Sequence, residues 1–162
     1  MKTKGFTLFE LLITLSLLGL IFALSTVKFT RMFAGSRLKT AALGVRDLFS
    51  YGISRAYTTG KYHTIVFDLS NGKYWLKIGR EDVEEAEEIL KRSLGKGITF
   101  SEITVSANTY TPPGTLEVEI SPLGVTNDLL ITIEDSESRK LSIELDSLVQ
   151  RIVFHEEGDE QK

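Results

Sequence analysis

The sequence contains no cysteine among its 162 residues. Disulfides, thiolate metal sites, lipoprotein acylation and cysteine nucleophiles are therefore excluded. Only two histidines are present, and no phosphate-binding glycine loop, zinc-ligand spacing or nucleophile elbow occurs. These absences predict a protein that is not an enzyme and that needs no cofactor.

Proline and excess positive charge are also scarce. The three prolines begin only at Pro112, so nothing upstream of that position forces a helix to break. The net charge is −3, which gives no broad attraction to nucleic acid. About 130 residues follow the N-terminal apolar run, enough for one modest soluble domain.

One long apolar run is present, from Phe6 to Val27, and it holds a single charge, Glu10. As a helix it would be roughly 33 Å long, which matches a bilayer core of about 30 Å. The run is too long for a cleaved secretory signal, although an uncleaved signal anchor stays possible. A carboxylate in a membrane helix costs about 2.5–3.5 kcal/mol at the centre and usually marks a function.

The residues around Glu10 form a recognisable pattern. Lys2 and Lys4 precede Gly5-Phe6, Glu10 follows at a fixed distance, and the spanning run continues beyond it. This pattern resembles the processing site of type IV pilins and of type II secretion pseudopilins. The resemblance implies that prepilin peptidase cuts between Gly5 and Phe6, that the new Phe6 amine is methylated, and that Glu10 serves assembly.

Physical chemistry gives the same residues a role. Cleavage would place a positive amine on Phe6, one helical turn from Glu10, so each charge could stabilise the other in apolar surroundings. The partner amine could belong to the same chain or to a neighbour. By charge alone the flank of Lys28, Arg31, Arg37 and Lys39 would be cytoplasmic, whereas the resemblance implies a cytoplasmic leader and an exported domain.

The helix is expected to continue beyond the span. Apolar residues recur at steps of three and four and should face the soluble domain, with Gly35, Gly44 and Gly52 marking bends or close contacts with a sheet. Gly60 is a natural helix end. The stripe consists of Leu38, Ala41, Ala42, Val45, Leu48, Phe49, Ile53 and Ala56.

From Tyr62 the sequence alternates as strands do. Residues 62–69 and 73–78 flank Asn71-Gly72, a strong hairpin signal. His63 is expected to be structural, and Tyr74 and Trp75 should point to opposite faces, one under the helix and one nearer solvent. Further strands are expected at 98–105, 116–120, 129–133, 140–145 and 149–154.

Two acidic segments have alternative interpretations. Residues 81–94 are expected to form a short helix or an acidic loop with a solvated face rather than a cation site. Asp135, with Glu134 and Glu137, is expected to form a polar hairpin turn, although a calcium site was the alternative. No metal site is predicted.

The second half of the sequence narrows the resemblance to one subgroup of these proteins. The long helix, the hairpin around Asn71, the turn Ser121–Gly124 and a final hairpin are similar to the H-type minor pseudopilins, although Gln150 stands where that family often has glycine before Arg151. The expected fold is α+β, with a long N-terminal helix, membrane-spanning in its first half, packed on an antiparallel β domain. The expected segments are a cleaved leader (1–5), an assembly helix (6–27), an amphipathic helix (28–59), a β domain (60–155) and an acidic tail (156–162).

The predicted function is that of a structural subunit. A minor pseudopilin would be anchored once in the bacterial inner membrane with its C-terminal domain in the periplasm, and would join a pseudopilus with other pseudopilins and an inner-membrane assembly platform. The alternative is a minor type IV pilin of a pilus or DNA-uptake machine. Nucleic-acid binding is not expected, since the basic helix flank of Arg37, Lys39, Arg46 and Arg55 is better explained as a solvated face.

Overall fold

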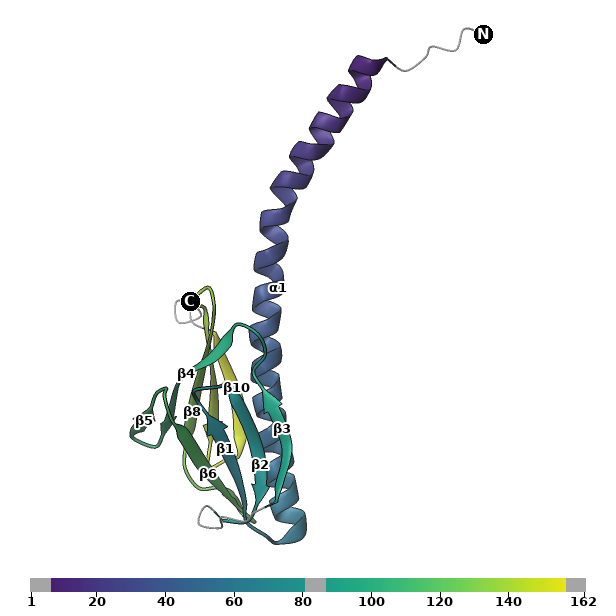
Figure 1. Ribbon diagram of the computed structural model, residues 1–162. Helices are drawn as coiled ribbons and strands as arrows, with labels where there is room; N and C mark the ends of the chain where they lie inside the picture. Colours follow the sequence, from purple (N-terminus) through teal and green to yellow (C-terminus); the bar gives the residue numbers. More distant parts are fainter. Residues whose placement is uncertain (1–6, 81–86, 157–162) are drawn as a thin grey trace. The chain divides into compact units, whose positions relative to one another are not determined.

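A single long helix, α1 (Leu8–Thr59), comes first in the chain (Figure 1). The computed structural model describes residues 7–80 and 87–156, with the backbone alone for residues 23–35 and 156. The chain divides into two units, residues 1–36 and 37–162. As predicted, the helix ends before Gly60, which has a φ of +65° and donates its N–H to the Ala56 carbonyl at 2.9 Å.

The second unit holds two antiparallel sheets of five strands each. Their orders are β3-β2-β1-β6-β7 and β10-β9-β8-β4-β5. The α+β fold is therefore confirmed, and the β domain divides into two layers. The strands are β1 (His63–Asp68), β2 (Lys73–Ile78), β3 (Glu88–Ser93), β4 (Ile98–Val105), β5 (Asn108–Tyr110), β6 (Thr115–Ser121), β7 (Gly124–Val125), β8 (Leu129–Asp135), β9 (Lys140–Asp146) and β10 (Arg151–Glu156).

The predicted hairpin around Asn71 is confirmed. Strands β1 and β2 pair antiparallel from His63↔Ile78 to Asp68↔Lys73. Asp68 accepts hydrogen bonds from the backbone and side-chain N–H groups of Asn71 at 3.1 and 2.8 Å, and Gly72 has a φ of +61°. The Asp68 bonds close a turn over residues 69–72, and glycine supplies the positive φ at its last position.

The predicted helix stripe packs into the core of the second unit. Seven of its eight residues are buried, and Ile53 is partly buried against them. Phe49 of the helix joins Phe67, Tyr74 and Phe100 in an aromatic cluster whose ring centroids lie 5.6–6.4 Å apart. Because Tyr74 is buried and Trp75 only half-buried, the prediction that they face opposite sides is confirmed.

The expectation for residues 81–94 was wrong in its second half. Glu88–Ser93 form the edge strand β3, which pairs with β2 through contacts such as Leu76↔Ile89. Without β3, one edge of β2 would have unpaired backbone groups, and pairing gives residues 88–93 hydrogen-bond partners along that edge. An isolated short helix is marginal in water, whereas Ile89 of the strand packs on the core. Residues 81–86 lie outside the described residues.

The short strands β5 and β7 were not predicted, because two or three residues carry no measurable alternation. The last strand begins at Arg151 rather than at Val149. Leu148 and Val149 lie instead in the turn before it, where their backbone N–H groups donate to Asp146 at 2.9 and 3.2 Å.

Candidate functional site

The start of α1 is fixed by Thr7. Its side-chain Oγ1 accepts a hydrogen bond from the Glu10 backbone N–H at 3.2 Å, and its carbonyl accepts from Glu10 and Leu11 at 3.1 and 3.2 Å. Thr7-Leu8-Phe9-Glu10 thus has the spacing of a capping box, in which threonine caps and glutamate occupies the third helical position. Sequence analysis overlooked this cap, although the Thr-x-x-Glu spacing was available to reveal it.

Glu10 therefore lies in the first helical turn. Glu10 is exposed, and the helix dipole favours a negative charge at this position near the helix N-terminus. The other predicted processing residues, Lys2, Lys4, Gly5 and Phe6, lie outside the described residues. The predicted pairing of Glu10 with the Phe6 amine consequently remains a prediction.

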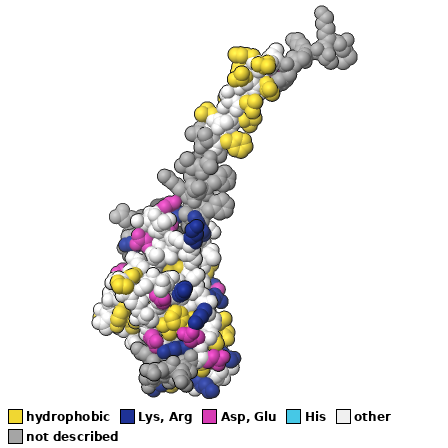
Figure 2. Space-filling view, viewed as in Figure 1, with side chains coloured by type: hydrophobic (Ala, Val, Ile, Leu, Met, Phe, Trp, Pro, Cys, Tyr) yellow, Lys and Arg dark blue, Asp and Glu magenta, His cyan; other side chains and the backbone are white. Residues whose placement is uncertain are grey.

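Residues 8–22 of the helix expose apolar side chains on all faces. Figure 2 shows hydrophobic side chains gathered along this part of the chain. Eleven large apolar residues between Leu8 and Phe22 are exposed, with values of 80% for Leu8 and 72% for Phe22. A helix that is apolar all round needs an apolar environment or neighbouring helices.

The polar side chains within this apolar segment are satisfied internally. Thr14 donates its hydroxyl to the carbonyls of Glu10 and Leu11 at 3.0 and 2.9 Å, and Ser16 donates to Leu12 at 2.8 Å. These bonds leave neither hydroxyl in need of water. Glu10 is then the one charge among residues 8–22. Within the described residues, no helix meets the length and hydropathy required to cross a membrane.

The remaining candidate residues have structural surroundings. His63 is buried, and its Nδ1 lies 3.0 Å from the Lys61 carbonyl, as expected of a structural histidine. Asp135 accepts the backbone N–H groups of Glu137 and Arg139 and pairs with the Arg139 side chain. This carboxylate is thus engaged in a hairpin turn, and the described residues contain no group of three metal-ligating side chains.

The basic helix flank is partly neutralised. Arg46 pairs with Asp47 at 2.8 Å and lies 6.0 Å from the ring centre of Phe154. Arg37, Lys39 and Arg55 are exposed. A phosphate-binding stripe would need several unpaired cations on one element, and here one of the four already has a carboxylate partner.

Comparison with known proteins bears on both units. Residues 1–26 match the family described as the prokaryotic N-terminal methylation motif. The structure of the minor pseudopilin EpsH from the type 2 secretion system of Vibrio cholerae resembles this one with a TM-score of 0.56 and 9% sequence identity, over 76% of this chain and 99% of that chain. The fold of this chain is pilin-like. Among curated proteins, none matches the sequence.

The first finding concerns a sequence motif and the second concerns the fold. The motif covers the segment in which Gly5, Phe6 and Glu10 were singled out. The structural likeness concerns the arrangement of a helix on antiparallel sheets, and at 9% identity it shows a shared fold. Together they confirm the resemblance on which the sequence analysis relied.

Proposed function

We propose that this chain is a minor pseudopilin of a type II secretion system. The observation that carries the proposal is Glu10, the one charge among residues 8–22, in the first turn of a helix whose other side chains there are almost all apolar and exposed. Such a helix is stable only among lipids or other apolar helices. The minor-pseudopilin subtype is supported by the fold shared with EpsH.

The proposed sequence of events begins with export and processing. Prepilin peptidase cuts between Gly5 and Phe6 and methylates Phe6, while residues 6–27 anchor the chain once in the inner membrane. The domain from about residue 37 lies in the periplasm. An inner-membrane assembly platform then transfers the subunit into a fibre with other pseudopilins, where the apolar helices pack together.

In this proposal Glu10 acts electrostatically. In lipid its carboxylate is costly, and a positive amine on a Phe6 residue offsets that cost. Only a defined axial position brings carboxylate and amine together, so the pair sets the register between subunits. The chain contributes structure to the fibre and no chemical reaction.

The proposal predicts opposite effects of Glu10→Ala on two processes. Membrane insertion should be unchanged or easier, because a charge is removed, whereas incorporation into fibres should fall at least about tenfold, because an amine loses its buried partner. Site-specific crosslinking from Leu15 to neighbouring subunits, together with membrane fractionation, measures both.

The matched control is Glu87→Ala, which removes an exposed carboxylate from the β domain. It should leave crosslinking at the wild-type level. Wild-type crosslinking in Glu10→Ala would show that the carboxylate has no role in assembly and would contradict the proposal.

A further inference from the structure

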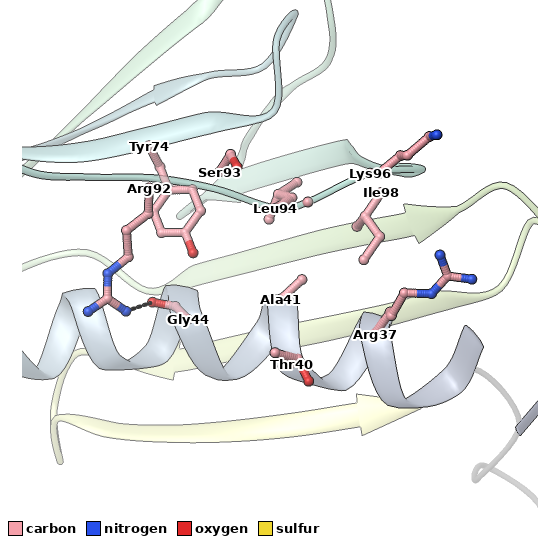
Figure 3. Close-up of a pocket in the computed structure, with 11 residues that line it drawn as sticks. Arg37, Thr40, Ala41, Gly44, Tyr74, Arg92, Ser93, Leu94, Lys96 and Ile98 are labelled. Carbon is pink, nitrogen blue, oxygen red and sulfur yellow. Dashed lines mark hydrogen bonds between the residues drawn. The ribbon is translucent and has the colours of Figure 1, made fainter. Parts of the chain in front are cut away.

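A cleft of about 500 Å³ lies beside α1 in the second unit. Helix residues Arg37, Ala41 and Gly44 form one wall, and Tyr74 of β2 together with residues 92–96 and Ile98 forms the other. In Figure 3 the side chains of Tyr74, Arg92 and Ile98 extend from the strands toward the helix, whereas the Lys96 side chain points away from it. The volume is within the range of clefts that bind ligands or peptide side chains, about 300–1,000 Å³.

Three cations line this cleft: Arg37, Arg92 and Lys96. Within the described residues, none of the three forms a salt bridge, and Arg92 donates one long hydrogen bond of 3.4 Å to the Gly44 carbonyl. Five other cations of this unit have carboxylate partners. These pairs are Arg46–Asp47, Lys77–Glu117, Arg80–Glu119, Lys91–Glu88 and Arg139–Asp135.

Between these cations the lining is apolar. Ala41, Leu94 and Ile98 contribute side chains that are buried in the isolated chain. Figure 3 places Arg92 near Gly44 at one end of the cleft, and Arg37 and Lys96 near its other end. The cleft therefore offers positive charge at both ends of an apolar middle.

The helix comes close to the strands here because Gly44 has no side chain. A Cβ at this position would lie 2.6 Å from the Tyr74 hydroxyl oxygen. Tyr74 is otherwise buried, so its hydroxyl adds one polar group to the cleft beside Arg92. Core packing therefore fixes the helix against β2 at this end of the cleft.

We propose that this cleft binds an extended acidic segment of another protein chain, with a carboxylate at each end and an apolar side chain between them. Two carboxylates satisfy cations that have no carboxylate partner among the described residues, and the apolar side chain covers Ala41, Leu94 and Ile98. This inference goes beyond the proposed function, because it requires neither processing nor fibre formation.

Nucleic-acid phosphate is a poorer fit for the same cleft. A phosphate backbone presents charge at every nucleotide and would leave the apolar middle uncovered. The chain as a whole has a net charge of −3 and ends in an acidic segment, His155–Lys162. Repulsion from this charge disfavours a duplex more than it does a short peptide.

The test uses the full-length protein in zwitterionic micelles and a fluorescent peptide with the sequence of residues 81–88. In this peptide, pairs of acidic residues flank Val83 and Ala86. Fluorescence anisotropy at low salt should show saturable binding at or below about 1 mM peptide. Combined replacement of Arg37, Arg92 and Lys96 by glutamine should weaken binding about tenfold. Amide chemical-shift changes in the wild-type protein should centre on Leu94, Gly95 and Lys96.

The controls distinguish binding in this cleft from non-specific electrostatic attraction of the peptide to the protein. Arg55→Gln with Lys61→Gln removes two exposed cations outside the cleft and should leave affinity unchanged, and a peptide with glutamine and asparagine at its acidic positions should not bind. Absence of peptide binding, equal weakening by the control variant, or shift changes elsewhere would each overturn the proposal. Tighter binding of a DNA duplex at the same amides would overturn the choice of occupant.

Discussion

Gln150 joins the two sheets of the β domain. Its Oε1 accepts the Val125 N–H at 3.0 Å, and its Nε2 donates to the carbonyls of Val125 and Ser147 at 2.9 and 2.5 Å. Val125 belongs to β7 of one sheet, whereas Gln150 precedes β10 of the other. The side chain also fills the space beside Gly124, where a Cβ would lie 2.4 Å from Oε1.

Replacing Gln150 should therefore weaken the contact between the sheets. Gln150→Ala should lower the free energy of unfolding by about 2–3 kcal/mol, because three partly buried hydrogen bonds are lost. Gln150→Gly should recover about 1 kcal/mol of this, since residue 150 has a φ of +52° that glycine adopts without strain. Urea denaturation of the full chain in micelles measures both.

Asn108→Ala, on an exposed residue of β5, serves as the control and should change stability by less than about 0.5 kcal/mol. If Gln150→Ala changed the free energy of unfolding as little as this control does, Gln150 would not hold the sheets together.

Asp135 links stability to pH. Burial opposes its ionisation, but hydrogen bonds from the Arg139 side chain and from the backbone N–H groups of Arg139 and Glu137 outweigh burial and hold its pKa below the usual 3.8. The folded state thus binds this proton less readily than the unfolded state. Its contribution to stability is present above pH 3.8 and is lost as the pH falls through the lower folded pKa.

The stability difference between wild type and Asp135→Asn should therefore be largest near neutral pH and should shrink below about pH 4. Urea titrations at pH 7, 5 and 3 measure this difference. A difference that stays constant from pH 7 to pH 3 would mean that the Asp135 charge does not stabilise the fold.

At the scale of elements, close packing of α1 on the sheet depends on glycine. A Cβ at Gly52 would lie 2.7 Å from Ile120 Cδ1 and 3.3 Å from Leu76 Cδ1, and both neighbours are fully buried. The sequence predicts bends or close contacts with a sheet at Gly44 and Gly52. The structure confirms the contacts and identifies the strand residues that make them.

Gly52→Ala should destabilise the protein by about 1–3 kcal/mol through overpacking, although alanine is the better helix former by about 1 kcal/mol. Gly19→Ala is a matched helical control, since its Cβ would meet nothing within 4 Å. Thermal unfolding of the β domain should shift for Gly52→Ala alone. An unchanged or raised melting temperature for Gly52→Ala would show that the sheet yields at this contact.

Strong local signals made much of the fold predictable. The helix stripe from Leu38 to Ala56, the Asn71-Gly72 turn and the helix end at Gly60 each rest on a pattern within one segment. The edge strand β3 could not be predicted, because its formation depends on the free edge of β2. The role of Gln150 depends on Val125, 25 residues away, so its departure from the family pattern gave no indication of its contacts.

The candidate site was likewise predicted from a local pattern, and its residues before Thr7 lie outside the described residues. Its defining spacing, from Gly5 to Glu10, is entirely local in sequence, and the Thr7 cap could have been found in the same way. The cationic cleft could not, since Arg37, Arg92 and Lys96 are brought together only by folding.

At the scale of the whole molecule, the two units of the chain differ in how their apolar side chains are covered. Residues 8–22 of the helix expose apolar side chains, and the domain from residue 37 buries its own core. In the proposed function, the subunit first lies in a membrane and later exchanges lipid for neighbouring helices. Processing after Gly5 would supply the amine that Glu10 needs for that exchange.

The most direct measurement is the intact mass of the protein extracted from membranes of cells that also express a prepilin peptidase. The account predicts a chain that lacks Met1–Gly5 and carries one added methyl group on Phe6, and it predicts that a bulky replacement of Gly5 blocks the cut. A chain that still begins at Met1 in cells where a known prepilin is fully processed would contradict the pseudopilin assignment.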